Sequence, residues 1–148
     1  MPEQQATTSH SLTVAAGTEN LARVRCFVRA AAAELGANPD AVDDLVLAVD
    51  EVVTNVIMHG YQNREGTVDV EIERKGDDAI VRVRDQAPPF DPTRVPEPDL
   101  NVPLEERPVG GLGVFLIRQM VDEMRYRAGI QGGNELTLIK HMGYEGNR

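Results

Sequence analysis

The chain has 148 residues, and its 15 Lys and Arg against 24 Asp and Glu give a formal net charge of −9. This length suits one compact domain with a hydrophobic core. An acidic chain without a Lys or Arg block argues against DNA or RNA as the main partner. The single cysteine, Cys26, excludes an intramolecular disulfide and a thiolate metal cluster. The only serines, Ser9 and Ser11, lie in a polar N-terminal stretch, which argues against a serine-nucleophile hydrolase.

Targeting and metal signals are missing from the sequence. No apolar run approaches the length of a membrane span, and no signal peptide with a basic start and an apolar middle is present. The histidines His10, His59 and His141 lie far apart, without the spacing of metal ligands. We therefore expect a cytoplasmic protein that binds no membrane.

The N-terminal part predicts an arm, a strand and a helix. Residues 1–11 are polar and are expected to form a flexible arm, followed by a short strand over Leu12–Ala15. Thr18 is expected to cap a first helix, in which apolar residues recur at helical spacing until Gly36.

A second helix is predicted to begin at Asn38-Pro39, because proline fits the first helical position. Its valines and leucines form a continuous apolar face that ends near Met58. Glu51, Asn55 and His59 are each four residues apart and therefore form a polar stripe on the side away from that face. The stripe is either a solvated helix surface or a carboxylate base beside an amide oxygen that could bind a hard cation such as Mg²⁺.

The pattern then changes to a period of two, which predicts a hairpin of strands over residues 68–73 and Ala79–Arg84. An irregular segment follows from Ala87 to Val109, because seven of the nine prolines fall between Pro88 and Pro108. We interpret this segment as a lid or a binding loop.

The C-terminal part predicts a third helix that begins at Gly110-Gly111-Leu112-Gly113, then strands over Arg125–Ala128 and Glu135–His141. Residues 143–148 are expected to form a tail. Strands and helices in this proportion indicate an α/β fold in which helices cover one face of a single sheet.

Two further spots could carry chemistry. Asp85 ends the second hairpin strand, where its carboxylate could accept a hydrogen bond from an amino group of a ligand or could only cap a turn. The glycines Gly110, Gly111 and Gly113 at a helix start would let backbone N–H groups approach phosphate oxygens, or they could form only a hinge. They are not a P-loop, because its Lys-Ser/Thr pair is missing.

Three stretches, in this order, resemble the sequence boxes of the GHKL (Bergerat-fold) ATP-binding superfamily. Asp50–Tyr61 resembles the N box, Asp85–Pro92 the G1 box and Gly110–Ile117 the G2 box. Within the superfamily the chain is most similar to the stand-alone bacterial anti-sigma-factor serine/threonine kinases, over nearly all of residues 12–142. The resemblance implies a two-layer α/β sandwich with one mixed, mostly antiparallel sheet, and ATP bound between the helices and a loop lid.

The resemblance also implies roles for single residues. Glu51 would be the general base, Asn55 would coordinate Mg²⁺, and Asp85 would bind the adenine amino group. Arg107 in the lid is a candidate for contact with the γ-phosphate. The whole set implied to bind the nucleotide is Asn55, Asp85, Ala87, Arg107, Gly110, Gly111, Leu112 and Gly113.

Ala87 departs from the family pattern, which usually has glycine at this position. Glycine permits backbone angles and close ligand approach that a Cβ hinders, so Ala87 puts the nucleotide affinity in doubt. The partners implied are a sigma factor and an antagonist, the anti-anti-sigma protein, that carries the phosphorylated serine or threonine. A homodimer through the sheet and first helix is permitted by the apolar positions around Val24 and Phe27.

Two functions from different classes compete. The first is a kinase that moves the γ-phosphoryl group of ATP to a serine or threonine of the antagonist, and Glu51 favours it because a pure binder needs no base. The second is an ATP-dependent binding module that sequesters its partner without phosphorylating it. A detached histidine-kinase ATPase domain is a weaker reading, since His10 lies in a polar arm and not on a dimerisation helix.

Overall fold

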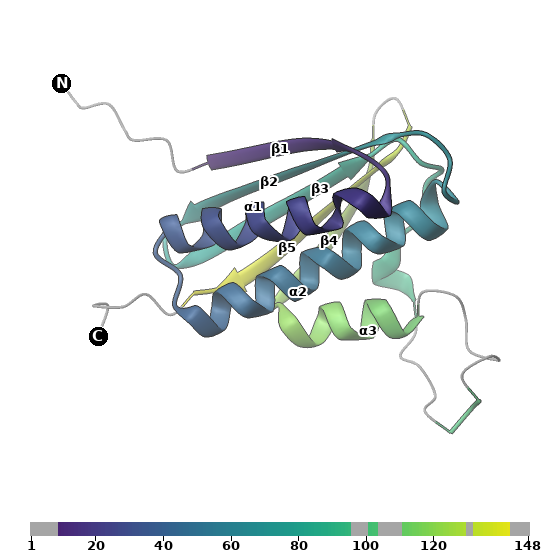
Figure 1. The fold of residues 1–148 in the computed structure, drawn as a ribbon. Coiled ribbons are helices and arrows are strands. Elements are labelled where there is room, and N and C mark those ends of the chain that lie inside the picture. The colour runs from purple at the N-terminus through teal and green to yellow at the C-terminus, as the bar shows by residue number, and fades with distance from the viewer. Residues whose placement is uncertain (1–8, 96–100, 104–110, 130–131, 143–148) are drawn as a thin grey trace.

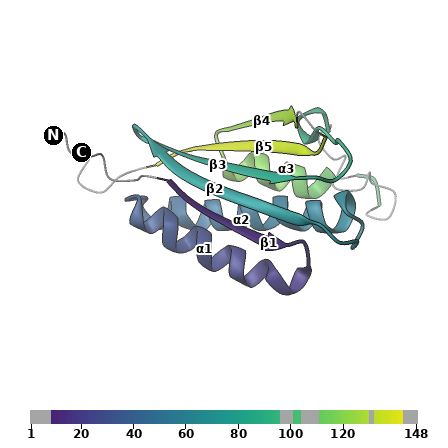
Figure 2. The same cartoon turned by 90° about the horizontal axis from the view of Figure 1, so that it is seen from above.

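The computed structural model describes residues 9–95, 101–103, 111–129 and 132–142. These residues form a two-layer α/β sandwich, as expected. One layer is a five-stranded sheet, and the other consists of three α-helices that lie together on one face of the sheet (Figures 1 and 2).

The described strands pair only in the antiparallel sense. They are β1 (Ser9–Ala15), β2 (Thr67–Lys75), β3 (Asp78–Asp85), β4 (Glu123–Ala128) and β5 (Asn134–His141). The spatial order is β1-β2-β3-β5-β4, and each neighbouring pair is antiparallel. The expectation of a mixed sheet is therefore wrong for the described residues. The physical reason is that β5 inserts between β3 and β4, which run in the same direction and would otherwise form a parallel pair.

Strand β1 begins at Ser9, three residues before the expected start at Leu12, so the end of the expected arm belongs to the sheet. Polar side chains of β1 bond to its neighbour β2. The hydroxyl of Ser9 donates to Glu71 over 3.1 Å, and that of Thr13 donates to Asp69. Polar residues therefore extend the strand, although their composition alone resembles a loop.

The first helix, α1 (Leu21–Glu34), follows a 3₁₀ turn over Thr18–Asn20. Thr18 lies inside this turn and does not cap the helix, because the chain tightens into the turn before α1 begins. Val24 is fully buried, and Phe27 packs against the same core. Of the two apolar positions expected to permit a dimer contact, Val24 is therefore unavailable, whereas Phe27 is only partly buried.

The second helix, α2 (Pro39–Asn55), begins as expected. The side chain of Asn38 accepts a hydrogen bond of 2.8 Å from the amide of Ala41, and Pro39 occupies the first turn. After Asn55 the backbone widens into a π-helix over Val56–Gly60. Such a widened turn at a helix end is often found at functional sites.

The core lies between the helices and the sheet. Helix α3 (Gly111–Met120) packs beside α2 and completes the helical layer (Figure 1). Full burial of one aliphatic side chain stabilises a fold by about 1.5–3 kcal/mol, and the core contains many such side chains. The largest fully buried ones include Leu45, Val49 and Val53 of α2, Ile117 of α3, and Val70, Val81 and Leu138 of the sheet. Among the described helices, none combines the length and apolar character needed to cross a membrane.

Candidate functional site

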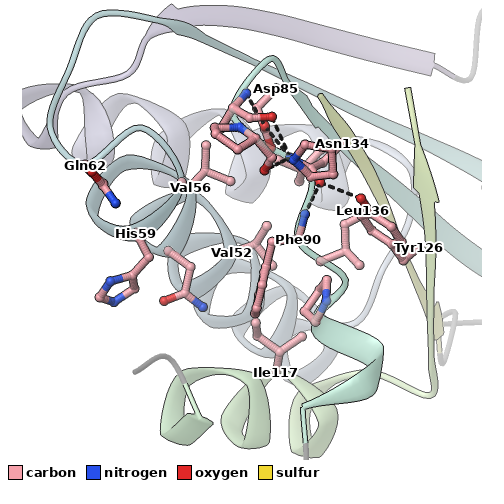
Figure 3. Close-up of a pocket in the computed structure, with 17 residues that line it drawn as sticks. Val52, Val56, His59, Gln62, Asp85, Phe90, Ile117, Tyr126, Asn134 and Leu136 are labelled. Carbon is pink, nitrogen blue, oxygen red and sulfur yellow. Dashed lines mark hydrogen bonds between the residues drawn. The ribbon is translucent and has the colours of Figure 1, made fainter. Parts of the chain in front are cut away.

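A cavity of about 360 Å³ lies between the C-terminal half of α2, helix α3 and the inner face of the sheet. Its walls are mostly aliphatic, and a few polar groups gather at its ends (Figure 3). This composition is typical of a small-molecule site, in which apolar walls bind a ring system and polar groups select it. The lining includes Val52, Asn55, Val56, His59, Val83, Asp85, Ala87, Phe90, Ile117, Tyr126, Asn134 and Leu136.

Asp85 is the one buried charged or polar residue among those described, with 5% of its surface exposed. Its Oδ1 atom accepts hydrogen bonds of 2.8 Å from the amide of Ala87 and from Nδ2 of Asn134. Burial raises the pKa of the Asp85 carboxyl, and the two hydrogen bonds oppose that rise. The other carboxylate oxygen, Oδ2, has no protein donor among the described residues. A ligand N–H group that entered the cavity would therefore satisfy a costly buried acceptor.

The start of α3 packs closely against α2. A Cβ atom placed on Gly113 would lie 3.1 Å from Oε1 of Glu51 and 3.2 Å from Nδ2 of Asn55. A Cβ there would push both side chain ends by a few tenths of an ångström, so glycine leaves them undisturbed at this close approach. The sequence predicted that Glu51, Asn55 and Gly113 belong to one site, and in the structure both side chains lie close to Gly113.

Glu51 and Asn55 take different positions relative to the cavity. Asn55 lines it, whereas Glu51, one helical turn earlier, lies beside the lining and against α3. Partial burial raises the pKa of the Glu51 carboxyl, and the charge of the adjacent Asp50 raises it further. A carboxylate with a raised pKa is a better proton acceptor at neutral pH than an ordinary one. His59, the third member of the stripe, is exposed at the rim.

Ala87 fits its position without backbone strain. Its φ angle is outside the left-handed region, so the backbone here does not require glycine. Its side chain is 2% exposed and faces Gly60, where an added Cβ would lie 3.1 Å from the Ala87 methyl group. The methyl group therefore takes space left by Gly60, the last residue of the π-helix that follows α2.

Of the segment predicted to be irregular, the structure describes residues 88–95 and 101–103, and these are irregular except for a 3₁₀ turn over Pro92–Arg94. The carboxylate of Asp91 accepts a hydrogen bond of 2.9 Å from the amide of Thr93 and caps this turn. The guanidinium of Arg118 on α3 donates to the carbonyl oxygens of Thr93, over 2.7 Å, and of Val95, over 2.9 Å. Arg118, which was not predicted, therefore ties the beginning of the expected lid to α3.

Other predicted residues are described only in part. Arg107 and Gly110 lie outside the described residues. Gly111 and Leu112 are the first two residues of α3, so the third helix begins where the glycine cluster predicted it.

The sequence analysis missed three polar residues that build the Asp85 end of the cavity. Asn134 donates to Asp85, and the hydroxyl of Tyr126 donates to Oδ1 of Asn134 over 2.6 Å. The hydroxyl of Tyr61 accepts from the amide of Gln86 over 2.7 Å and donates to the carbonyl of Thr67 over 2.8 Å. The signal available for Asn134 was the glycine pair Gly132-Gly133, which directly precedes it in the sequence.

The second glycine of this pair, Gly133, shapes the backbone next to Asp85. Gly133 has a φ angle of 85°, and a Cβ there would lie 2.2 Å from the carbonyl oxygen of Asp85. The glycine therefore lets β5 start close to the end of β3, which delivers Asn134 to Asp85.

Metal binding by protein side chains alone is not supported in the described part of the chain. No group of three or more His, Cys, Asp or Glu residues there could hold a metal ion. An oxygen ligand is available at Asn55, whose amide lines the cavity. A hard cation at this place would need further oxygen atoms from a bound ligand.

Comparison with known proteins agrees with this geometry. The family model described as the histidine kinase-like ATPase domain matches residues 14–140. The serine-protein kinase RsbW of Halalkalibacterium halodurans is 34% identical over 125 residues, which cover 80% of this chain and 76% of that relative. The anti-sigma F factor of Clostridium kluyveri is 28% identical over 123 residues, which cover 83% of this chain and 87% of that relative.

A solved structure shares the fold. The crystal structure of the RsbU and RsbW domains of a Mycobacterium tuberculosis protein matches 93% of this chain with a TM-score of 0.66 and 22% identity. The match spans 33% of that longer chain. The family model covers most of the sequence, and a relative above 30% identity covers most of its length. The chain therefore belongs to the histidine kinase-like ATPase domain family, among the relatives of the serine-protein kinase RsbW.

Proposed function

We propose that this chain is a serine/threonine protein kinase that uses ATP and acts as the anti-sigma factor of a partner-switching system. The observation that carries the proposal is the arrangement of polar groups around one apolar cavity. A buried carboxylate, Asp85, lies at one end, and Glu51 and Asn55 meet the glycine start of α3 beside it. The relatives named as serine-protein kinase and anti-sigma F factor support the same function.

ATP fits the chemistry of the cavity. The volume of about 360 Å³ lies within the range of small-molecule sites, roughly 300–1,000 Å³. Aliphatic side chains such as Val52, Ile117 and Leu136 would hold the flat adenine ring. The free Oδ2 atom of Asp85 would accept a hydrogen bond from the adenine amino group.

Mg²⁺ and the phosphates fit the other end. The Asn55 amide oxygen is a hard ligand, and Mg²⁺ is usually held by one or two protein ligands together with phosphate oxygens. The N-terminus of α3 offers backbone N–H groups and the positive end of the helix dipole. Mg²⁺ would neutralise negative charge on the phosphates, which lowers the barrier to their transfer.

Glu51 is the group we assign as the general base. In the reaction, the hydroxyl oxygen of the acceptor serine or threonine forms a bond to the γ-phosphorus, and the bond from that phosphorus to the β,γ-bridging oxygen breaks. The hydroxyl proton passes to the Glu51 carboxylate, and ADP is the leaving group. The raised pKa of Glu51 suits this task, because its carboxylate retains the proton more readily.

The protein partners we propose are a sigma factor and an anti-anti-sigma antagonist that carries the acceptor hydroxyl. Arg107 is proposed to reach the γ-phosphate, and Ala87 to contact the nucleotide through its backbone beside Asp85. Within this proposal the protein acts in the cytoplasm, where sigma factors and ATP are both present.

The test is transfer of phosphate from ATP radiolabelled at its γ-phosphate, with Mg²⁺ and candidate antagonist domains from the same genome. The proposal predicts label on a serine or threonine of one antagonist. Binding of ATP and of a partner without transfer to any antagonist would favour the alternative, a binding module that sequesters its partner.

A further inference from the structure

Asn134, the first residue of β5, uses both ends of its side-chain amide. Its Nδ2 atom donates to Oδ1 of Asp85 over 2.8 Å. Its Oδ1 atom accepts from the hydroxyl of Tyr126 over 2.6 Å and from the backbone amide of Phe90 over 2.8 Å (Figure 3). One amide therefore connects the end of β3, the segment that follows it, and β4.

These bonds fix which way the amide faces. The backbone amide of Phe90, which can only donate, faces Oδ1 of Asn134, and the Asp85 carboxylate, which can only accept, faces its Nδ2 atom. A flipped amide would place its NH₂ group against the Phe90 N–H and its oxygen against the Asp85 carboxylate, whereas the Tyr126 hydroxyl could bond to either orientation. The NH₂ group is therefore held toward Asp85, where it also lies 3.3 Å from the carbonyl oxygens of Ala87 and Pro88.

The fixed amide in turn fixes the Asp85 carboxylate. Oδ1 of Asp85 already accepts two hydrogen bonds, from the Ala87 amide and from Asn134. The carboxylate plane is thereby set, and Oδ2 remains as the acceptor for a ligand. The carboxylate therefore offers an acceptor to a ligand at this point.

The same amide also positions an aromatic ring. The Phe90 side chain is 53% exposed although it lines the cavity, and it extends from the Asn134 end toward Ile117 (Figure 3). An aromatic face beside a fixed acceptor suits a flat heterocycle that carries an amino group. Asn134 holds the backbone from which that ring projects.

We infer that Asn134 is a positioning residue that sets the purine selectivity of the site, by fixing both the Asp85 acceptor and the Phe90 ring. Adenine presents an amino group at C6, and guanine presents a carbonyl oxygen there. The amino group donates to Oδ2, whereas the carbonyl oxygen meets a second acceptor and is rejected. This inference rests on the proposed function, since it assumes that Asp85 reads a purine.

The test compares the dissociation constants of ATP and GTP for the full chain by calorimetry with Mg²⁺. Asn134→Ala should reduce the preference for ATP over GTP about tenfold, because a freed Asp85 carboxylate no longer presents a fixed acceptor to the adenine amino group, and loss of a hydrogen bond to a charged group costs about that factor. Tyr126→Phe, which removes one of the two hydrogen bonds to Oδ1 of Asn134, should reduce the same ratio by a smaller factor. Asn20→Ala removes an amide that bonds only the Ala15 carbonyl outside the cavity, and should leave the ratio unchanged.

The outcomes separate the two proposals. An Asn134→Ala variant with the wild-type ratio of ATP to GTP affinity would overturn the selectivity role, even if it binds both nucleotides more weakly. Binding of ATP by the wild-type chain would still be established. If Asn134→Ala does not fold, an unchanged ratio in Asn134→Leu, which keeps the size of the side chain and removes both ends of the amide, would overturn it instead. A wild-type chain that binds neither nucleotide would contradict the proposed function itself, and this inference with it.

Discussion

Substitution of Gly113 by alanine separates folding from function at the contact between α2 and α3. The new Cβ would lie 3.1 Å from Oε1 of Glu51 and 3.2 Å from Nδ2 of Asn55, closer than ordinary contacts. The atoms it meets are the ends of flexible side chains, so they can move by a few tenths of an ångström without any backbone shift. The fold should therefore survive.

Gly113→Ala should change the stability of the fold little and the rate of phosphate transfer strongly. Glycine to alanine within a helix stabilises it by about 1 kcal/mol, so the free energy of unfolding of Gly113→Ala should stay within about 1 kcal/mol of wild type. Displaced Glu51 and Asn55 should nevertheless slow phosphate transfer about tenfold or more, since an error of about 1 Å in a catalytic group can cost about a hundredfold.

The assay is denaturant unfolding together with phosphate transfer to the antagonist. Gln119→Ala, at an exposed position of α3, is the control for changes in helix stability alone. Wild-type transfer by Gly113→Ala would refute the assignment of Glu51 and Asn55 to the site. A loss of stability well above 1 kcal/mol would show that the contact is not relieved by side-chain movement.

Two further substitutions test the ends of the cavity. Asp85→Asn should weaken ATP binding about tenfold to a hundredfold, measured by calorimetry, because it removes a charge-assisted hydrogen bond to the ligand. The same substitution should raise the stability of the fold at neutral pH, measured by thermal unfolding, because it removes a buried charge. Arg118→Ala removes the donors to the carbonyls of Thr93 and Val95, so the amides of Arg94 and Val95 should exchange with solvent about tenfold faster by hydrogen exchange.

The sign of the pH dependence follows from the pKa of Asp85, which burial raises above its ordinary value of 3.8. Between the unfolded and folded pKa values the folded state binds more protons, so the stability that Asp85 contributes falls as the pH rises through the folded value. The stability difference between Asp85→Asn and wild type should therefore be smallest below pH 3.8 and grow toward neutral pH. A difference that does not change with pH would contradict a raised pKa.

Local patterns were sufficient for much of the fold. The cap at Asn38-Pro39 and the valine stripe behind it predicted α2, and strict alternation predicted the hairpin of β2 and β3. Glu51 and Asn55 were predicted as a pair because helical spacing alone places them on one face. That Gly113 belongs to the same site was predicted only from the resemblance of the three boxes, because no local sequence rule relates Gly113 to the second helix.

The errors arise where distant parts of the chain decide the structure. Strand β1 starts at Ser9 because β2 offers it partners, and serine or threonine side chains on the solvent face hide that pairing in the sequence. The sheet lacks a parallel pair among the described strands because β5 inserts beside β3. Asn134 lies 49 positions after Asp85, and no periodicity links two residues that meet only across neighbouring strands.

The measurement that tests the central claim most directly compares Mg-ATP affinity and phosphate transfer in wild type and Glu51→Gln. Glutamine keeps the size of the side chain and removes its basicity, so Mg-ATP affinity should change little. Transfer to the antagonist should fall about 10²–10⁴-fold, the usual contribution of a positioned general base. A Glu51→Gln variant that phosphorylates the antagonist at the wild-type rate would contradict the assignment of Glu51 as the base of this kinase.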